Sequence, residues 1–196
     1  MYTAYFLPLL ATLGATLPTA EDYSLDIAKA IVARAPPEAK AVLKSTTSTG
    51  TGCGPNSAAF LINDNATVAF DAMVVESTSK DLSKKCLITI DLQLDPKWKY
   101  TINKASDIRG YIDHGNAKIK VLYTVGGDSS EVNGDINAAT KQDYSYVFHS
   151  TSPGATSAPG GGVATIDVQV RLLPEAGTAS AVTVDSIDIG FNYAKA

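Results

Sequence analysis

The chain has 196 residues, of which 45% are hydrophobic and 18% are charged. This composition is enough to bury one full hydrophobic core, and the length predicts one domain more readily than two. The formal net charge of −4 argues against a nucleic-acid or anionic-membrane partner, because such partners attract clustered lysine and arginine side chains.

The first twenty residues have the shape of a secretory signal peptide. An apolar stretch runs from residue 5 to about residue 13, and small residues follow it up to Ala20. The alternative is a buried N-terminal helix, which Pro8 and Gly14 disfavour. No later segment approaches about 20 uninterrupted apolar residues, so we expect a secreted chain with no transmembrane segment after cleavage.

Residues 21–35 carry the one helical pattern of the chain. Apolar residues recur there at spacings of three and four, Ser24 can cap the helix, and Pro36 and Pro37 stop it. We therefore expect residues 21–39 to be either a pro-segment or an N-terminal helix on the domain.

From about Lys40 onward the hydrophobic period changes to two. Ile88, Ile90 and Leu92, for example, alternate with polar residues, as in a half-buried strand. The candidate strands are 41–48, 57–63, 66–73, 88–94, 98–104, 107–113, 118–125, 142–149, 165–172 and 181–193. About ten strands without intervening helices are typical of an antiparallel β-sandwich or jelly roll. We predict an all-β fold, with a single β-sandwich domain over residues 40–196.

Two turn-rich segments are predicted to be surface loops. The acidic segment 126–135 contains oxygen ligands suited to calcium, but it lacks the spacing of an EF-hand, so we expect a solvated hairpin loop. Segment 150–162 is low in bulky side chains, which predicts a mobile loop. With only two cysteines and two widely spaced histidines, a zinc site is not expected, and no metal or cofactor is predicted.

Two further features agree with a secreted protein. In an oxidising compartment the cysteine pair, Cys53 and Cys86, is expected to form a disulfide that closes a loop of about 34 residues and stabilises the fold by about 4 kcal/mol. Asn65 begins an Asn-Ala-Thr motif in a predicted turn, which makes it a candidate N-glycosylation site.

Four segments carry a resemblance to a known family. They are GTGCGPNS (Gly50 to Ser57), FLINDNATVAFDAM (Phe60 to Met73), SKKCLITIDLQLDPKWKYTI (Ser83 to Ile102) and DIRGYIDHG (Asp107 to Gly115). In order and spacing they resemble a secreted, mostly fungal and partly bacterial family known as domain of unknown function four-three-six-zero. The match runs from about Pro36 through Val125 and thins beyond it.

The resemblance implies a secreted β-rich domain and supports a bond between Cys53 and Cys86. Two departures from the family pattern matter: Gly54 stands before Pro55, and a later W-S-P-C-G segment is replaced by YSYVFHSTSPG (Tyr144 to Gly154). A second disulfide is therefore not expected. The resemblance transfers no catalytic residue to this chain.

The segment Ser106 to Gly115 holds the densest group of reactive side chains. In an extended strand Asp107, Arg109, Tyr111 and Asp113 share one face, and we name these four residues the polar stripe. Arg109 can reach Asp107 to form an ion pair. His114 should point away from Asp113, which argues against a His-Asp pair that activates a nucleophile.

Aromatic residues near this segment are candidates for stacking on sugar rings. Trp98, Tyr100, Tyr111 and Tyr123 could form such a platform, although aromatic residues in strands are more often core or cross-strand pairs. The candidate ligand-binding residues are thus Trp98 and Tyr100 together with the polar stripe.

Paired carboxylates for glycoside hydrolysis need a separation of roughly 5 to 9.5 Å. Asp107 and Asp113 lie about 20 Å apart along one strand, which is too far. Asp91 could approach either of them if its strand were a neighbour. A hydrolase is therefore an alternative, but an enzyme is not the favoured reading and no catalytic residue is assigned.

The sequence favours a secreted, non-catalytic module that binds extracellular polysaccharide or a host protein, either free or associated with a cell wall. A carboxylate-dependent hydrolase and a secreted effector or toxin are the alternatives. The oligomeric state, the ligand and the fate of residues 21–35 stay open.

Overall fold

The computed structural model describes residue 32 and residues 34–62, 66–102, 105–137, 141–150 and 153–196. The predicted signal peptide, nearly all of the helical segment and Asn65 lie outside the described residues. The described chain begins with a single turn of 3₁₀ helix, η1 (Pro37–Ala39), whose Ala39 is fully buried.

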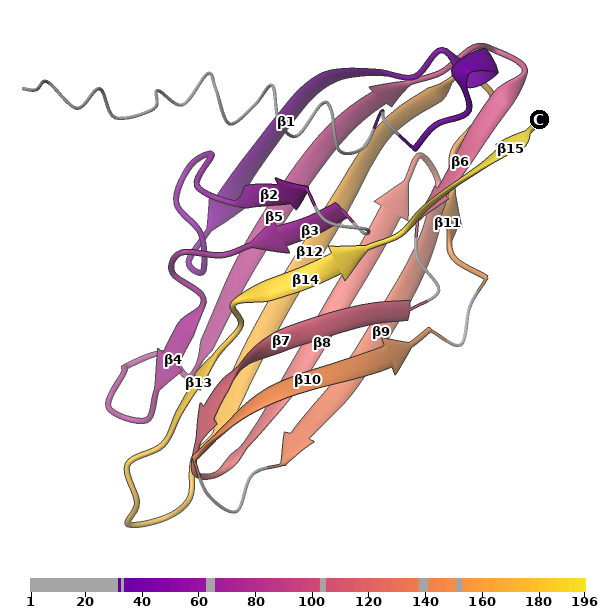
Figure 1. Cartoon of the computed structure of the whole chain (residues 1–196). Coiled ribbons are helices and arrows are strands. Elements are labelled where there is room, and N and C mark those ends of the chain that lie inside the picture. Colours follow the sequence, from indigo (N-terminus) through magenta and orange to yellow (C-terminus); the bar gives the residue numbers. More distant parts are fainter. Residues whose placement is uncertain (1–31, 33, 63–65, 103–104, 138–140, 151–152) are drawn as a thin grey trace, which may run out of the picture.

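Five long antiparallel strands form one layer of the molecule. In spatial order the five-stranded sheet contains β1 (Val42–Gly50), β5 (Ser83–Gln93), β12 (Gly161–Leu173), β8 (Asn116–Val125) and β9 (Asp128–Asn137). These strands run diagonally behind the other elements in Figure 1.

A second layer crosses in front of the first (Figure 1). The seven-stranded sheet has the order β2 (Ala59–Ile62), β3 (Ala66–Ala69), β14 (Ser186–Ile189), β7 (Ala105–Asp113), β13 (Ala181–Thr183) and β4 (Val74–Glu76), and β10 (Gln142–His149) pairs with β7. A small third sheet contains β11 (Ala155–Thr156), β6 (Trp98–Ile102) and β15 (Phe191–Lys195).

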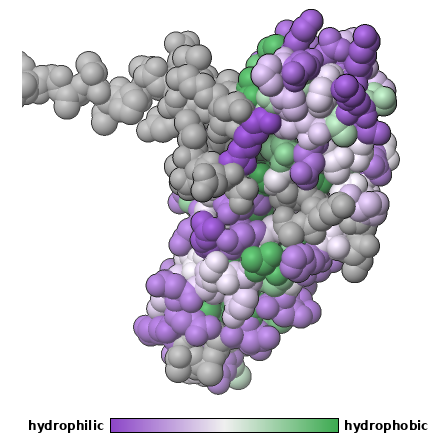
Figure 2. All heavy atoms as spheres, turned by 45° about the vertical axis from the view of Figure 1, so that its right-hand side comes forward, coloured by the Kyte–Doolittle hydropathy of each residue, from purple (hydrophilic) through white to green (hydrophobic). Residues whose placement is uncertain are grey.

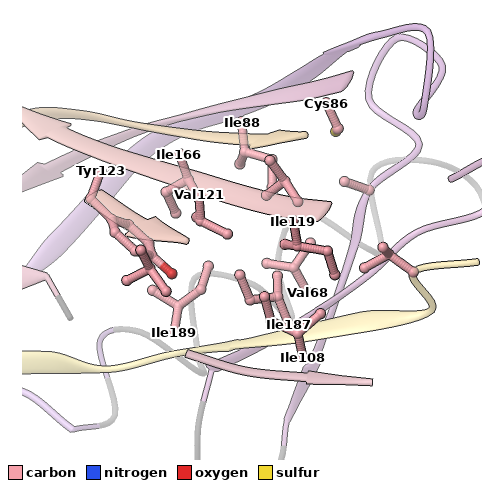
Figure 3. Packing of buried hydrophobic residues seen from close by; sticks show 14 of the residues in the cluster. Val68, Cys86, Ile88, Ile108, Ile119, Val121, Tyr123, Ile166, Ile187 and Ile189 are labelled. Carbon is pink, nitrogen blue, oxygen red and sulfur yellow. The ribbon is translucent and has the colours of Figure 1, made fainter. Parts of the chain in front are cut away.

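The hydrophobic core lies between the two large sheets. Ile88, Val121 and Ile166 point inward from the five-stranded sheet toward Ile108 and Ile187 of the other layer, as Figure 3 shows, and all five are fully buried. The alternating positions that face the core are those that the period-two pattern predicts. The fold is therefore an antiparallel β-sandwich, and the predicted all-β class is confirmed.

The predicted disulfide is confirmed between Cys53 and Cys86, with their Cα atoms 5.4 Å apart. It ties the turn after β1 to strand β5. Disulfides of this kind are typical of proteins from oxidising compartments.

The prediction of a solvated loop over residues 126–135 is wrong. Val125 and Asp128 are partners across a two-residue turn, and the rest of the segment forms β9. The alternation was hard to see because two inward positions, Ser130 and Gly134, are not hydrophobic. A Cβ atom at Gly134 would lie 1.9 Å from a ring carbon of Phe148, so the aromatic ring of β10 fills the space that a side chain would take.

The prediction of a mobile loop is also wrong for the described residues 153–162. Ala155 is fully buried on β11, and Ser157 is held twice by strand β6. The Ser157 amide donates to the Tyr100 carbonyl oxygen over 2.8 Å, and the Ser157 hydroxyl accepts from the Tyr100 amide over 3.0 Å. Backbone pairing orders this segment although it lacks bulky side chains.

The C-terminal segment 181–193, predicted as one strand, is divided among β13, β14 and β15. The first two belong to the seven-stranded sheet and the third pairs with β6. Segment 66–73 is likewise shorter than predicted, because β3 ends at Ala69. A run of alternating residues does not reveal where a chain leaves one sheet for another.

Two buried tyrosines predict loss of stability in alkali. Burial raises the pKa of the Tyr100 and Tyr144 phenols well above their ordinary value of 10.0. Above pH 10 both phenols stay protonated in the folded chain, whereas in the unfolded chain they ionise. Their contribution to the stability of the fold is therefore complete below pH 10 and is lost as the pH rises above it. Exposed tyrosines should ionise first, whereas Tyr100 and Tyr144 should ionise only when the chain unfolds. We therefore expect the loss of the circular dichroism signal to coincide with the last part of the rise in tyrosinate absorbance. Ionisation of every tyrosine near pH 10 with the fold intact would contradict this expectation.

Candidate functional site

The polar stripe lies on the outer face of β7, as predicted. Its residues alternate with the buried Ile108, Gly110 and Ile112. The predicted ion pair is present, since Arg109 Nη2 lies 2.6 Å from Asp107 Oδ2. The same nitrogen also lies 3.1 Å from Asp188 Oδ2 on the neighbouring strand β14.

Hydroxyl groups on strands β3 and β10 donate hydrogen bonds to the carboxylates of Asp188 and Asp107. The Thr67 hydroxyl of β3 donates to Asp188 over 2.5 Å, and the Ser145 hydroxyl of β10 donates to Asp107 over 3.0 Å. The hydrogen bond from Arg109 to Asp107 and the nearby charge of Asp188 raise the arginine pKa further above its usual value. This network joins four strands of the seven-stranded sheet, which gives it a structural role.

The prediction that Asp113 and His114 point apart is wrong. His114 Nε2 lies 3.6 Å from Asp113 Oδ1. The strict alternation fails because β7 ends at Asp113, and His114 enters the turn to β8 with a positive φ of 56°. Lys141 Nζ lies 3.0 Å from the other carboxylate oxygen of Asp113, so this carboxylate is shared between two basic side chains.

Trp98 and Tyr100, the two aromatic residues predicted to bind a ligand, lie on a different sheet from the polar stripe. Tyr100 is fully buried, and its hydroxyl donates to the Gly162 carbonyl oxygen over 2.9 Å. Trp98 is half-buried and packs against the core. Both lie on β6 of the small sheet, whereas the stripe lies on the seven-stranded sheet. A buried ring offers no face to a sugar, so Tyr100 leaves the set of candidate ligand residues.

The carboxylates considered for hydrolysis lie on opposite sides of the sandwich. Asp91 points outward from β5 in the five-stranded sheet, while Asp107 and Asp113 point outward from β7 in the other layer. The expectation that Asp91 could approach either of them is wrong, because β5 and β7 are not neighbours. These carboxylates cannot flank one glycosidic bond.

One face of the molecule is largely hydrophilic. On the face shown in Figure 2, most of the described residues are hydrophilic or intermediate, and the hydrophobic ones lie in small groups. The large hydrophobic side chains exposed among the described residues are Val42, Val74, Val147, Val163 and Leu173. They come from four different strands, with Val163 and Leu173 at opposite ends of β12, and do not mark a single apolar binding face.

A hollow on the outer face of the five-stranded sheet was missed at the level of sequence. This depression, of about 400 Å³, lies across β12, β8 and β9. Its size falls in the range of ligand-binding pockets in proteins. We name it the polar depression, after the side chains that line it: Lys118, Lys120, Asn133, Asp135, Gln169 and Arg171.

Strand register places these six residues in two rows across the sheet. Arg171, Lys118 and Asp135 are successive partners in one row. Gln169, Lys120 and Asn133 are successive partners in the next. Neighbouring strands lie about 4.8 Å apart and rows of one face about 7 Å apart, so the six side chains form a compact grid.

Two of the three cations in the polar depression are paired with acids. Lys118 Nζ lies 3.1 Å from Asp135, and Lys120 Nζ lies 2.5 Å from Glu131 on the rim. The Asn133 amide donates to Glu131 over 2.6 Å. Hydrogen bonds from Lys120 and Asn133 hold the pKa of the Glu131 carboxyl below its ordinary value.

Two features are absent from the described part of the chain. No three His, Cys, Asp or Glu side chains there are grouped closely enough to hold a metal ion. No helix there is long and apolar enough to cross a membrane.

The fold and the polar depression together define a β-sandwich with a ligand-sized polar hollow on one outer face. A family model matches residues 39–195, and the chain belongs to that family, which is described as a domain of unknown function, DUF4360. The match extends well past Val125, where the sequence resemblance was expected to thin. None of the curated proteins matches the sequence.

The solved structures that match this chain resemble it only distantly. One is the TmCBM61 module in complex with β-1,4-galactotriose, at 12% identity and a TM-score of 0.32, with 76% of this chain and 90% of that chain covered. Another is a carbohydrate-binding module of the β-sandwich superfamily, at 12% identity and a TM-score of 0.28, with 74% and 56% covered. A family two carbohydrate esterase from Cellvibrio japonicus matches at 15% identity and a TM-score of 0.25, with 78% and 36% covered.

Proposed function

We propose that this protein is a secreted, non-catalytic module that binds extracellular polysaccharide in the polar depression on its five-stranded sheet. The observation that carries the proposal is the depression itself, in which three adjacent strands present hydrogen-bonding side chains in two rows. Sugars offer many hydroxyl groups, and each can donate and accept hydrogen bonds.

The position of the depression favours a polymer over a small metabolite. It lies on the outer face of a sheet and is built from side chains of regular strands, so a long chain can pass across it without entering the protein. Regular strands also fix the backbone and the direction of each Cα–Cβ bond, which lowers the entropy cost of binding. The buried disulfide and the predicted signal peptide favour an extracellular location.

Removal of two neutral hydrogen-bonding groups is expected to weaken binding. The recombinant domain is screened on neutral and acidic soluble polysaccharides and on insoluble cell-wall fractions. In the variant with both Gln169→Ala and Asn133→Ala, the dissociation constant of the best polymer should rise at least about tenfold, because each lost hydrogen bond weakens binding by about 1 kcal/mol. Affinity electrophoresis or calorimetry provides the measurement.

Gln93→Ala is the matched control, since Gln93 is exposed on the outer face of β5 in the same sheet but does not line the depression. Its dissociation constant should equal that of the unaltered protein. Failure to bind any polymer would refute the proposed function. Binding that is lost in Trp98→Ala with the fold intact, and retained in the depression variants, would move the site to β6.

A further inference from the structure

Arg171 differs from its neighbours in the polar depression. It is exposed on β12, and no acidic side chain within the described residues pairs with it. Lys118 and Lys120 each have a carboxylate partner there, and so does Lys85 on β5, whose Nζ lies 2.7 Å from Asp167. The charge of Arg171 is therefore the one in this group that no protein carboxylate neutralises.

The strand register adds a second, independent observation. Arg171 lies directly opposite Lys118 on β8, and on its other side its partner is Ser83 on β5. Like charges placed directly opposite each other on a sheet are destabilising, and the one acid in this row, Asp135, is paired with Lys118 and not with Arg171. An acid at position 83 would relieve this repulsion, but the sequence has a serine there. A bound anion would relieve it as well.

The local charge runs against that of the whole chain. The formal net charge is −4, yet three of the six polar residues that line the depression are cationic and one is acidic. With the Glu131 carboxylate beside Lys120 included, the depression has three cations and two carboxylates, so its net charge is +1 and it attracts anions. The local charge matters more than the net charge, because salt screens exposed charges that lie more than about 10 Å away.

We propose that the polar depression binds an acidic polysaccharide, and that Arg171 anchors one carboxylate or sulfate group of the bound polymer. The guanidinium presents paired N–H donors that match the two oxygens of a carboxylate or sulfate. Lys118, which is paired with Asp135, adds a second N–H donor group beside it. Gln169 lies two residues away on the same face of β12, about 7 Å along the strand, so the adjoining sugar hydroxyls can be bound at the same time. The inference rests on the proposed function and names its ligand class.

The test compares three polymers of defined charge: polygalacturonate, dextran sulfate and uncharged dextran. We expect at least one of the two acidic polymers to bind at least about tenfold more tightly than dextran, and the tighter of the two identifies carboxylate or sulfate. Binding should weaken as the salt concentration rises, because ions screen exposed charges. Arg171→Ala should reduce the affinity for that polymer at least about tenfold, since a charge-assisted pair is lost.

Two further variants make the result specific. Arg171→Lys keeps the charge but loses the paired donors. Its affinity for the acidic polymer should therefore lie between those of the unaltered protein and Arg171→Ala. Lys44→Ala removes one exposed positive charge from β1, away from the depression, and should change the affinity less than about twofold.

The outcomes separate the two proposals. If dextran or another neutral polymer binds as tightly as the acidic ones, or if Arg171→Ala binds like the unaltered protein, the anion inference is overturned and polysaccharide binding stands. If no polysaccharide binds at all, the proposed function fails with it. Equal affinity for single-stranded nucleic acid would overturn the assignment to an acidic polysaccharide.

Discussion

Replacement of Cys86 by serine is expected to lower the free energy of unfolding by about 4 kcal/mol. The disulfide joins Cys53 and Cys86, which are 33 residues apart in the chain, and it limits the freedom of the unfolded state. Both cysteines are buried, so a serine at position 86 also places a hydroxyl in the core. Urea unfolding followed by circular dichroism gives the free energies for the unaltered and the altered protein.

Unfolding in the presence of a thiol reductant provides an internal control for this prediction. Reduction should destabilise the unaltered protein, and it should leave the double variant Cys53→Ser, Cys86→Ser unchanged. Equal unfolding midpoints of the unaltered protein with and without reductant would show that the bond contributes nothing to stability.

Gly110→Ala is expected to destabilise the domain by about 3 kcal/mol. A Cβ atom at this position would lie 2.2 Å from the Thr183 carbonyl oxygen and 2.7 Å from the Tyr144 hydroxyl oxygen. The first of these atoms is backbone, so the clash can be relieved only if β7 and β13 move apart. Their separation would also disturb the hydrogen bond from the Tyr144 hydroxyl to the Thr183 carbonyl. Thermal and urea unfolding measure the loss.

Gly127→Ala is the matched control for this substitution. Gly127 lies in the turn between β8 and β9, and a Cβ atom there would meet nothing within 4 Å. Its unfolding free energy should stay within about 0.5 kcal/mol of the unaltered value. A Gly110→Ala protein as stable as Gly127→Ala would refute the close approach of β7 and β13.

Several features could be predicted because they depend on local pattern. Alternation along 88–94 and 165–172 identifies half-buried strands, since successive side chains of any strand point to opposite faces. The same rule placed Asp107 and Arg109 on one outer face. It failed at β9, where Ser130 and Gly134 occupy inward positions, and at His114, where the strand has already ended.

The sequence by itself determined the class of fold, the disulfide between Cys53 and Cys86, and which side of β8 and β12 faces outward. Only the tertiary structure decided that Asp91 lies on the opposite side of the sandwich from Asp107, that the Tyr100 ring is buried, and that Arg171 stands beside Lys118. The physical reason is that the face of a residue follows from the period of its own strand. Its neighbours across the sheet follow from the order and register of strands that are distant in the chain, and no local pattern encodes these.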